Sequence, residues 1–148
     1  MTDVPALPAV WRPRTTRVVA YATAGTIMVA MIVLAIVVAP PFGLSDRILM
    51  VVFGAFLAWI LHMLARCRVT ADDGGVTVVN AFRTRRLEWA EILDVNMNVG
   101  EPWPTLDLAD GTSLGAMGIN GTERRLAARQ LDELRTLVTE RGEAPDPS

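Results

Sequence analysis

Residues 18–39 read VVAYATAGTIMVAMIVLAIVVA and contain no charged side chain. A helix needs about 20 apolar residues to cross the hydrocarbon core of a bilayer, and this run is long enough. Residues 48–65 read ILMVVFGAFLAWILHMLA, a second run that is close to the lower limit for a span. Pro40 and Pro41 lie between the two runs and break a helix there. The two runs therefore predict a transmembrane helical hairpin over residues 18–66.

A cleaved signal peptide is the alternative interpretation of the first run. Its cleavage site would follow Ala39, the only small residue in a suitable position. However, the apolar run is longer than the usual core of a signal peptide, and Pro40 would stand directly after the cut, where proline is poorly accepted. We therefore favour a span over a signal peptide.

Arginine residues flank the two runs unequally. Three arginines precede the first run (Arg12, Arg14 and Arg17), and two follow the second (Arg66 and Arg68). The linker has one, Arg47. Because positive residues favour the cytoplasmic side, the pattern predicts a multi-pass protein of the cell membrane with both termini in the cytoplasm. Trp11 and Trp59 are expected in the two interfacial zones.

Small residues recur at four-residue spacing in both runs. Ala22, Thr26 and Ala30 share one face of the first helix, and Gly54 and Ala58 share one face of the second. Such faces allow helix backbones to approach closely in lipid. They could pack against each other or against a helix of another protein, and we favour mutual packing.

After Cys67 the apolar residues alternate with a period of two, which is typical of strands with one wet face. The predicted strands cover residues 68–71, 76–81, 85–89, 93–99, 106–108 and 114–116. The alternation is clearest in the fourth strand, where Leu93, Val95, Met97 and Val99 would share one face. Asp72-Asp73-Gly74-Gly75 and Asp110-Gly111 are expected turns.

The last part of the chain changes to a helical period. Asn120 or Thr122 can cap a helix that Gly142 ends, and an apolar stripe runs along it through Ala127, Leu131, Leu134 and Val138. We therefore expect an α+β domain over residues 67–142, an antiparallel barrel or meander covered by a C-terminal helix. Residues 1–17 form a cytoplasmic N-terminal segment in this scheme, and residues 143–148 a disordered tail.

Several motifs also resemble a known group. They are Trp11-Arg-Pro-Arg14, the run RRLEWAEI at 85–92, the run TLDLADG at 105–111 and Met117-Gly-Ile119. This chain resembles the actinobacterial membrane proteins with a pleckstrin-homology (PH)-like domain, of the low-molecular-weight antigen type. The resemblance implies a PH-like barrel with a C-terminal helix on the cytoplasmic side. It implies no catalytic residues and no cofactor.

Composition limits the possible functions of the 148 residues. The net charge of −2 argues against a general nucleic-acid binder. The only histidine, His62, lies inside a predicted span, so the soluble part lacks the base of a nucleophilic triad. Cys67 is the only cysteine and cannot form an internal disulfide. Asp72 and Asp73 are better explained by their turn than by a metal ion. We expect no enzymatic activity and no metal site.

Three features are candidates for a functional role. Arg83, Arg85 and Arg86 could contact anionic lipid, or could form a solvated face paired with Glu88 and Glu91. Trp103 lies between two prolines and could anchor a partner, or could cover the open end of the barrel. His62 could relay protons, but such a residue more often hydrogen-bonds a neighbouring helix or a lipid headgroup.

These observations favour a non-enzymatic accessory subunit of a larger integral membrane complex. The resemblance suggests an actinobacterial respiratory supercomplex of the cytochrome bcc–oxidase kind as a candidate host. The alternative is a module that binds anionic lipid or a peptide, alone or as a homo-oligomer.

Overall fold

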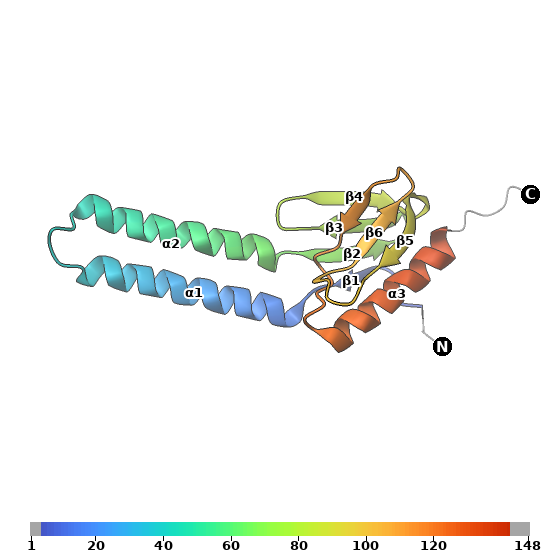
Figure 1. Ribbon diagram of the computed structural model, residues 1–148, viewed down its shortest axis with the longest axis horizontal. Coiled ribbons are helices and arrows are strands. Elements are labelled where there is room, and N and C mark those ends of the chain that lie inside the picture. The colour runs from blue at the N-terminus through green and yellow to red at the C-terminus, as the bar shows by residue number, and fades with distance from the viewer. Residues whose placement is uncertain (1–3, 143–148) are drawn as a thin grey trace, which may run out of the picture. The chain divides into compact units, whose positions relative to one another are not determined.

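The computed structural model describes residues 4–142, and Figure 1 shows its elements. The chain divides into two compact units, one made of residues 14–66 and one made of the chain on either side of them. The expected tail at residues 143–148 lies outside the described residues, as do residues 1–3.

Residues 14–66 form two helices, α1 (Arg14–Val37) and α2 (Leu44–Ala65). Both are long and apolar enough to cross a membrane. Their apolar side chains are largely exposed, which suits a hydrocarbon environment. The predicted pair of long apolar helices is therefore present.

Polar residues complete the turn between α1 and α2. The Asp46 carboxylate accepts a hydrogen bond of 2.8 Å from the Gly43 N–H and caps the start of α2. The Arg47 guanidinium donates to the carbonyls of Ile36 and Val38, at 3.3 and 2.9 Å. The Ile36 carbonyl lies in the last turn of α1 and the Val38 carbonyl directly after it, so Arg47 supplies hydrogen-bond donors to the C-terminal end of this helix.

Close packing of α1 on α2 centres on Gly54. A Cβ atom at this position would lie 2.9 Å from the Cβ and Cγ atoms of Met31 and 3.6 Å from the sulfur of Met28. Ala24 and Ala35 are buried on the same side of α1, four residues from Met28 and from Met31. The missing side chain of Gly54 therefore allows α1 to approach closely.

The prediction of mutual packing was wrong for the first helix. Ala22, Thr26 and Ala30 are exposed, because they lie on the side of α1 opposite the stripe that meets α2. The Thr26 hydroxyl donates to the Ala22 carbonyl at 2.9 Å, within the same helix. On α2, Gly54 is buried as expected and Ala58 is half-buried.

The other unit contains a four-stranded antiparallel sheet in the order β1-β2-β3-β4. Its strands are β1 (Ala9–Trp11), β2 (Arg68–Asp72), β3 (Gly75–Val79) and β4 (Thr84–Glu88). β1 was not predicted, and it comes from the segment before the first helix. Trp11 is 3% exposed in the core of this unit, so its expected interfacial position was wrong. The β1–β2 pairing recruits it into the sheet.

A 3-10 helix, η1 (Trp89–Glu91), leads into a second antiparallel sheet. This sheet contains β5 (Ile92–Asn96), β6 (Thr105–Leu108) and β7 (Ser113–Gly115), in that order. The predicted alternation along residues 93–99 was wrong. The β5–β6 register shifts between Ile92 and Asp94, so Ile92 and Val95 are buried while Leu93 is 67% exposed. An irregularity of this kind breaks the two-residue period.

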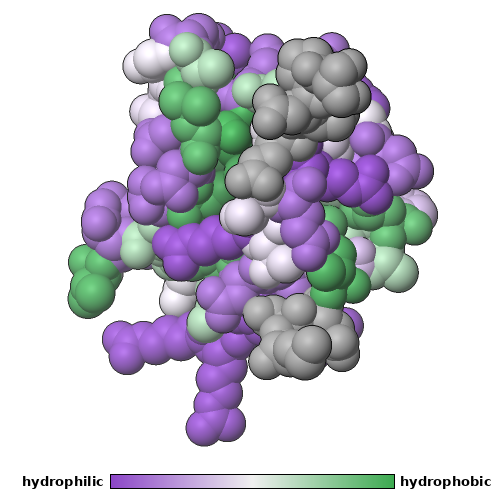
Figure 2. Space-filling view, turned by 90° about the vertical axis from the view of Figure 1, so that its right-hand side faces the viewer, coloured by the Kyte–Doolittle hydropathy of each residue, from purple (hydrophilic) through white to green (hydrophobic). Residues whose placement is uncertain are grey.

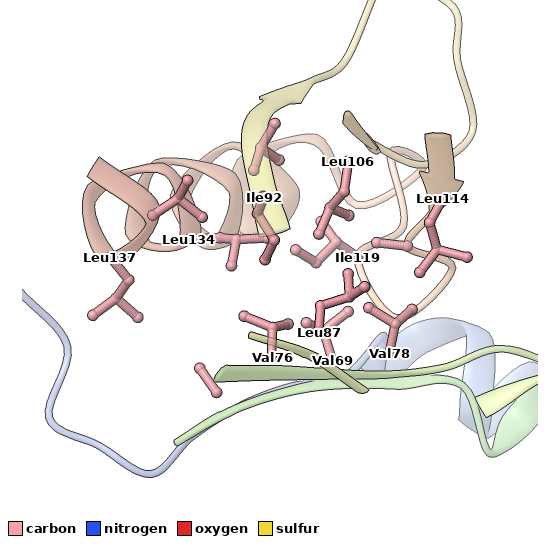
Figure 3. Packing of buried hydrophobic residues seen from close by; sticks show 14 of the residues in the cluster. Val69, Val76, Val78, Leu87, Ile92, Leu106, Leu114, Ile119, Leu134 and Leu137 are labelled. Atoms are coloured by element: carbon pink, nitrogen blue, oxygen red, sulfur yellow. The ribbon is translucent and has the colours of Figure 1, made fainter. Parts of the chain in front are cut away.

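Helix α3 (Arg124–Gly142) covers the core. The whole predicted stripe is buried, and Gln130 and Leu137 are buried with it. Figure 3 shows Leu134 and Leu137 of α3 pointing toward the side chains of the first sheet, among them Val76. One continuous cluster thus joins both sheets and the helix, as the sequence predicted for an α+β domain.

Candidate functional site

The predicted arginine cluster at the β3–β4 hairpin is largely neutralised. Arg86 holds Asp72 through two parallel hydrogen bonds, each 2.9 Å long. Arg85 lies 3.6 Å from the Asp110 carboxylate. The expected pairing with glutamates was therefore wrong in its partners: the acidic residues are aspartates in the two turns at the far end of the strands. Glu91 instead accepts the Glu88 N–H at 2.6 Å.

These contacts lower the pKa of the acidic groups involved. The Arg86 guanidinium, together with the Gly74 N–H, holds the pKa of Asp72 below its ordinary value of 3.8. The Thr112 hydroxyl and N–H lower the pKa of Asp110, and Arg85 adds to the shift. Both turns therefore stay anionic and keep the two arginines occupied.

Arg83 differs from the other two arginines. It is exposed in the turn between β3 and β4, and within residues 4–142 it forms no ion pair. The neighbouring Phe82 is 78% exposed. The Asn80 N–H bonds the Arg83 carbonyl at 2.8 Å and closes this turn. The β3–β4 turn thus presents one aromatic ring and one cation that forms no ion pair with the described residues.

Trp103 is half-buried against β7. A Cβ atom at Gly115 would lie 2.7 Å from the indole nitrogen of Trp103, so the glycine makes room for the ring. The next residue, Pro104, is fully buried. This position favours the interpretation that Trp103 covers part of the barrel over that of an exposed partner anchor.

Two hollows lie beside α3, one facing the loop after β5 and one facing β5 itself, and the sequence did not indicate them. One, of about 740 Å³, is lined by the chain after β5 and the start of α3, including Met97, Val99 and Leu131. The other, of about 400 Å³, includes Leu93 and Val138. Their only signal in the sequence was the pair Leu93 and Val99, which the expected alternation assigned to the core.

β5 is an edge strand, and between these hollows side chains already bond its outer backbone groups. The Arg135 guanidinium donates to the Val95 carbonyl at 2.7 Å. The Asp94 carboxylate accepts the Val95 N–H at 2.8 Å. An incoming strand would have to displace both side chains, so these contacts protect the edge against pairing.

His62 has a partner on the neighbouring helix. Its ring nitrogen Nδ1 lies 3.1 Å from the Tyr21 hydroxyl, and the two ring centroids are 6.0 Å apart. This contact agrees with the predicted hydrogen bond between helices. Among residues 4–142, no carboxylate forms an ion pair with His62.

The exposed side of α1 carries an open groove. Its volume is about 770 Å³, and its lining includes Ala22, Gly25, Thr26, Val29 and Ala30. A Cβ atom at Gly25 would meet nothing within 4 Å. The small residues predicted to pack a helix therefore form a shallow surface that α2 leaves uncovered.

The described part of the chain contains no group of residues suited to bind a metal ion. No three His, Cys, Asp or Glu side chains among residues 4–142 are grouped so that they could hold a metal ion. Asp72 is held by Arg86, and Asp73 lies 3.2 Å from Arg141.

Comparison with known proteins agrees with this architecture. Residues 66–143, more than half of the chain, match the family model described as bacterial PH domain. Uncharacterized proteins of Mycobacterium tuberculosis and Mycobacterium bovis are each 29% identical over 134 residues, which covers 87% of this chain and 87% of each relative. No solved structure matches. The mycobacterial relatives agree with the resemblance to actinobacterial proteins, and the family match covers strands β2 to β7 and the C-terminal helix. The chain therefore belongs to the bacterial PH domain family.

Proposed function

We propose that this protein is a non-enzymatic accessory subunit of a larger membrane complex. Its α1–α2 hairpin crosses the cell membrane with both termini in the cytoplasm, and one side of the hairpin packs against helices of the host. The PH-like domain then contacts the cytoplasmic surface of the host. The observation that carries this proposal is the small-residue face of α1, which α2 leaves open.

The small-residue face of α1 matters because the proposed surroundings of the hairpin are lipid. Apolar surface alone does not drive helices together in a bilayer, so close packing of small residues supplies much of the association energy. The hairpin uses Gly54 against Met31 for its internal contact. Ala22, Thr26 and Ala30 repeat the same kind of surface on the other side. One face closes the hairpin, and the other is available to a second protein.

The groove also suits a helix rather than a small ligand. It follows α1 from Tyr21 to Val37 and is lined almost entirely by apolar atoms. The Thr26 hydroxyl is bonded within its own helix, so it needs no partner in the groove. A partner helix could therefore dock through backbone proximity alone. A cytochrome bcc–oxidase supercomplex is the candidate host that the family resemblance suggests.

Extraction in mild detergent followed by native mass measurement tests this proposal. We expect the protein to co-purify with a larger integral membrane complex whose subunits can be identified. The double substitution Ala22→Leu/Ala30→Leu fills the groove and should release the protein from this complex. Ala55→Leu is the matched control, because Ala55 is an exposed small residue on α2.

The outcomes separate clearly. Release of the double variant with retention of Ala55→Leu would support docking through α1. Migration of the wild-type protein only as a monomer would contradict the accessory role. Equal retention of all three proteins would show that this face of α1 is not the docking surface.

A further inference from the structure

One end of the PH-like domain is defined by the points at which the chain enters and leaves it. In the first sheet Trp11 pairs with Val69, Arg68 pairs with Val79, and Val79 pairs with Thr84. The end of β1, the start of β2 and the β3–β4 turn therefore lie together. Both connections to the helical hairpin leave the sheet here, and we call this the junction end.

The second sheet shares this end. The Asn80 side chain donates to the Gly115 carbonyl at 2.7 Å and accepts the Met117 N–H at 3.0 Å. Gly115 pairs with Thr105, and Thr105 pairs with Asn96. The β5–β6 loop and the chain that leads into α3 therefore lie at the junction end as well.

Exposed apolar side chains gather at the junction end. Phe82 in the β3–β4 turn is 78% exposed, and Val99 in the β5–β6 loop is fully exposed. They are the two most exposed large apolar residues of the domain within residues 4–142. A single exposed apolar residue needs no explanation, but two on loops at the same end of a domain are notable.

Charge is also divided between the two ends. Within the domain, the junction end carries five arginines and two glutamates: Arg12, Arg68, Arg83, Arg124 and Arg125; Glu101 and Glu123. The opposite end carries Arg141 and six of the twelve acidic residues that the domain has within residues 4–142: Asp72, Asp73, Glu88, Glu91, Asp110 and Glu140. Figure 2 views this opposite end, whose surface is mostly hydrophilic.

We propose that the junction end docks on the surface of the bilayer that the hairpin crosses. Phe82 enters the boundary between headgroups and acyl chains, and Arg83 pairs with the phosphates of anionic phospholipids. An aromatic ring beside a cation suits this interface, where apolar and charged groups meet. Within residues 4–142 Arg83 forms no ion pair, whereas Asp110 and Asp72 hold Arg85 and Arg86. The inference rests on the hairpin crossing the bilayer and requires no protein partner.

Depth-dependent quenching in nanodiscs tests this contact with the full chain. An environment-sensitive fluorophore is attached to Phe82→Cys, and the discs contain lipids with quenchers near the headgroup. The native Cys67 is 3% exposed, so the new thiol is the one presented for labelling. Leu93→Cys is the matched control, because Leu93 is also exposed and apolar but lies at the opposite end of β5.

We expect strong quenching at position 82 in discs that contain phosphatidylglycerol, less in discs of phosphatidylcholine alone, and little at position 93 in either. Arg83→Gln should lower the ratio of membrane-embedded to solvent-exposed label about fivefold, which corresponds to about 1 kcal/mol per arginine near an anionic surface. Arg86→Gln should leave this ratio unchanged.

Two results would overturn the inference. One is a label at position 82 that stays unquenched in anionic discs. The other is equal quenching in neutral and anionic discs, which covalent tethering alone would produce. A label at Val99→Cys gives an independent measurement at the same end and should follow position 82. Because the discs hold only this chain and lipid, the result does not depend on whether a host complex exists.

Discussion

The indole nitrogen of Trp11 donates a hydrogen bond of 2.8 Å to the carboxylate of Glu133. The two residues are 122 positions apart, and the helical hairpin lies between them in the chain. Trp11 ends β1 and Glu133 lies in α3, so the bond connects the segment before the first helix to the helix that covers the core. The domain is therefore built from chain on both sides of the hairpin.

Removing the Trp11 contact should destabilise the PH-like domain. Trp11→Phe loses the hydrogen bond and should cost about 1 kcal/mol, whereas Trp11→Ala also leaves a core cavity and should cost about 3 to 5 kcal/mol. Amide hydrogen exchange of β2 and β3 measures the change in opening free energy. Val10→Ala is the control, because Val10 is half-exposed. Equal protection in Trp11→Ala and wild type would show that β1 is dispensable.

Acid sensitivity should depend on the Arg86–Asp72 pair. Because the folded domain lowers the pKa of Asp72 below 3.8, the ionised carboxylate stabilises the fold above that pH. The contribution is lost as the pH falls through the lower folded pKa. Arg86→Gln removes the largest cause of the shift, so stability should fall less steeply below about pH 3.8 than in wild type.

Urea unfolding of the domain at a series of pH values, followed by tryptophan fluorescence, measures this slope. Arg83→Gln is the control, since Arg83 forms no ion pair within residues 4–142 and the variant should keep the wild-type slope. Part of the acid sensitivity should persist in Arg86→Gln, because the pKa values of Asp110 and Glu101 are lowered as well. An unchanged slope in Arg86→Gln would contradict the assignment.

A larger residue at Gly54 should separate the two helices. The Cβ atom of Gly54→Val would lie 2.9 Å from two atoms of Met31, and relieving this overlap should cost about 1 to 3 kcal/mol. Unfolding in mixed micelles with increasing dodecyl sulfate measures hairpin stability. Gly25→Val is the matched control, because a Cβ atom there meets nothing within 4 Å. Similar losses in both variants would indicate a general effect of valine in the helix.

The Asn80 side chain should be needed to hold the two sheets together. It bonds the Gly115 carbonyl and the Met117 N–H, and Asn80→Ala leaves both partly buried backbone groups without a partner. We expect a loss of about 1 to 3 kcal/mol, seen as faster hydrogen exchange in β7. Asn96→Ala is the control, because the hydrogen bonds of its side chain to Asp94 and Asp107 lie at the exposed surface.

The order and spacing of apolar residues in the sequence were enough to predict the architecture. The two uncharged runs indicated the long apolar helices, since backbone groups in lipid must be satisfied within the segment. The stripe through Ala127, Leu131, Leu134 and Val138 indicated an amphipathic helix over a sheet. The alternation in β2 and β6 and the turn residues around Asp72 and Asp110 also agree with the structure.

Other features depended on tertiary contacts that no local pattern encodes. The three residues of β1 are strand only because β2 offers a free edge to them. The irregularity at Leu93 leaves the residue types unchanged but shifts which side chains reach the core. Likewise, α1 has small residues on more than one face, and its contact with Gly54 of α2 decides which face stays open. Residue spacing thus determined which segments are helical or extended, whereas the packing of those segments decided which side chains remain exposed for recognition.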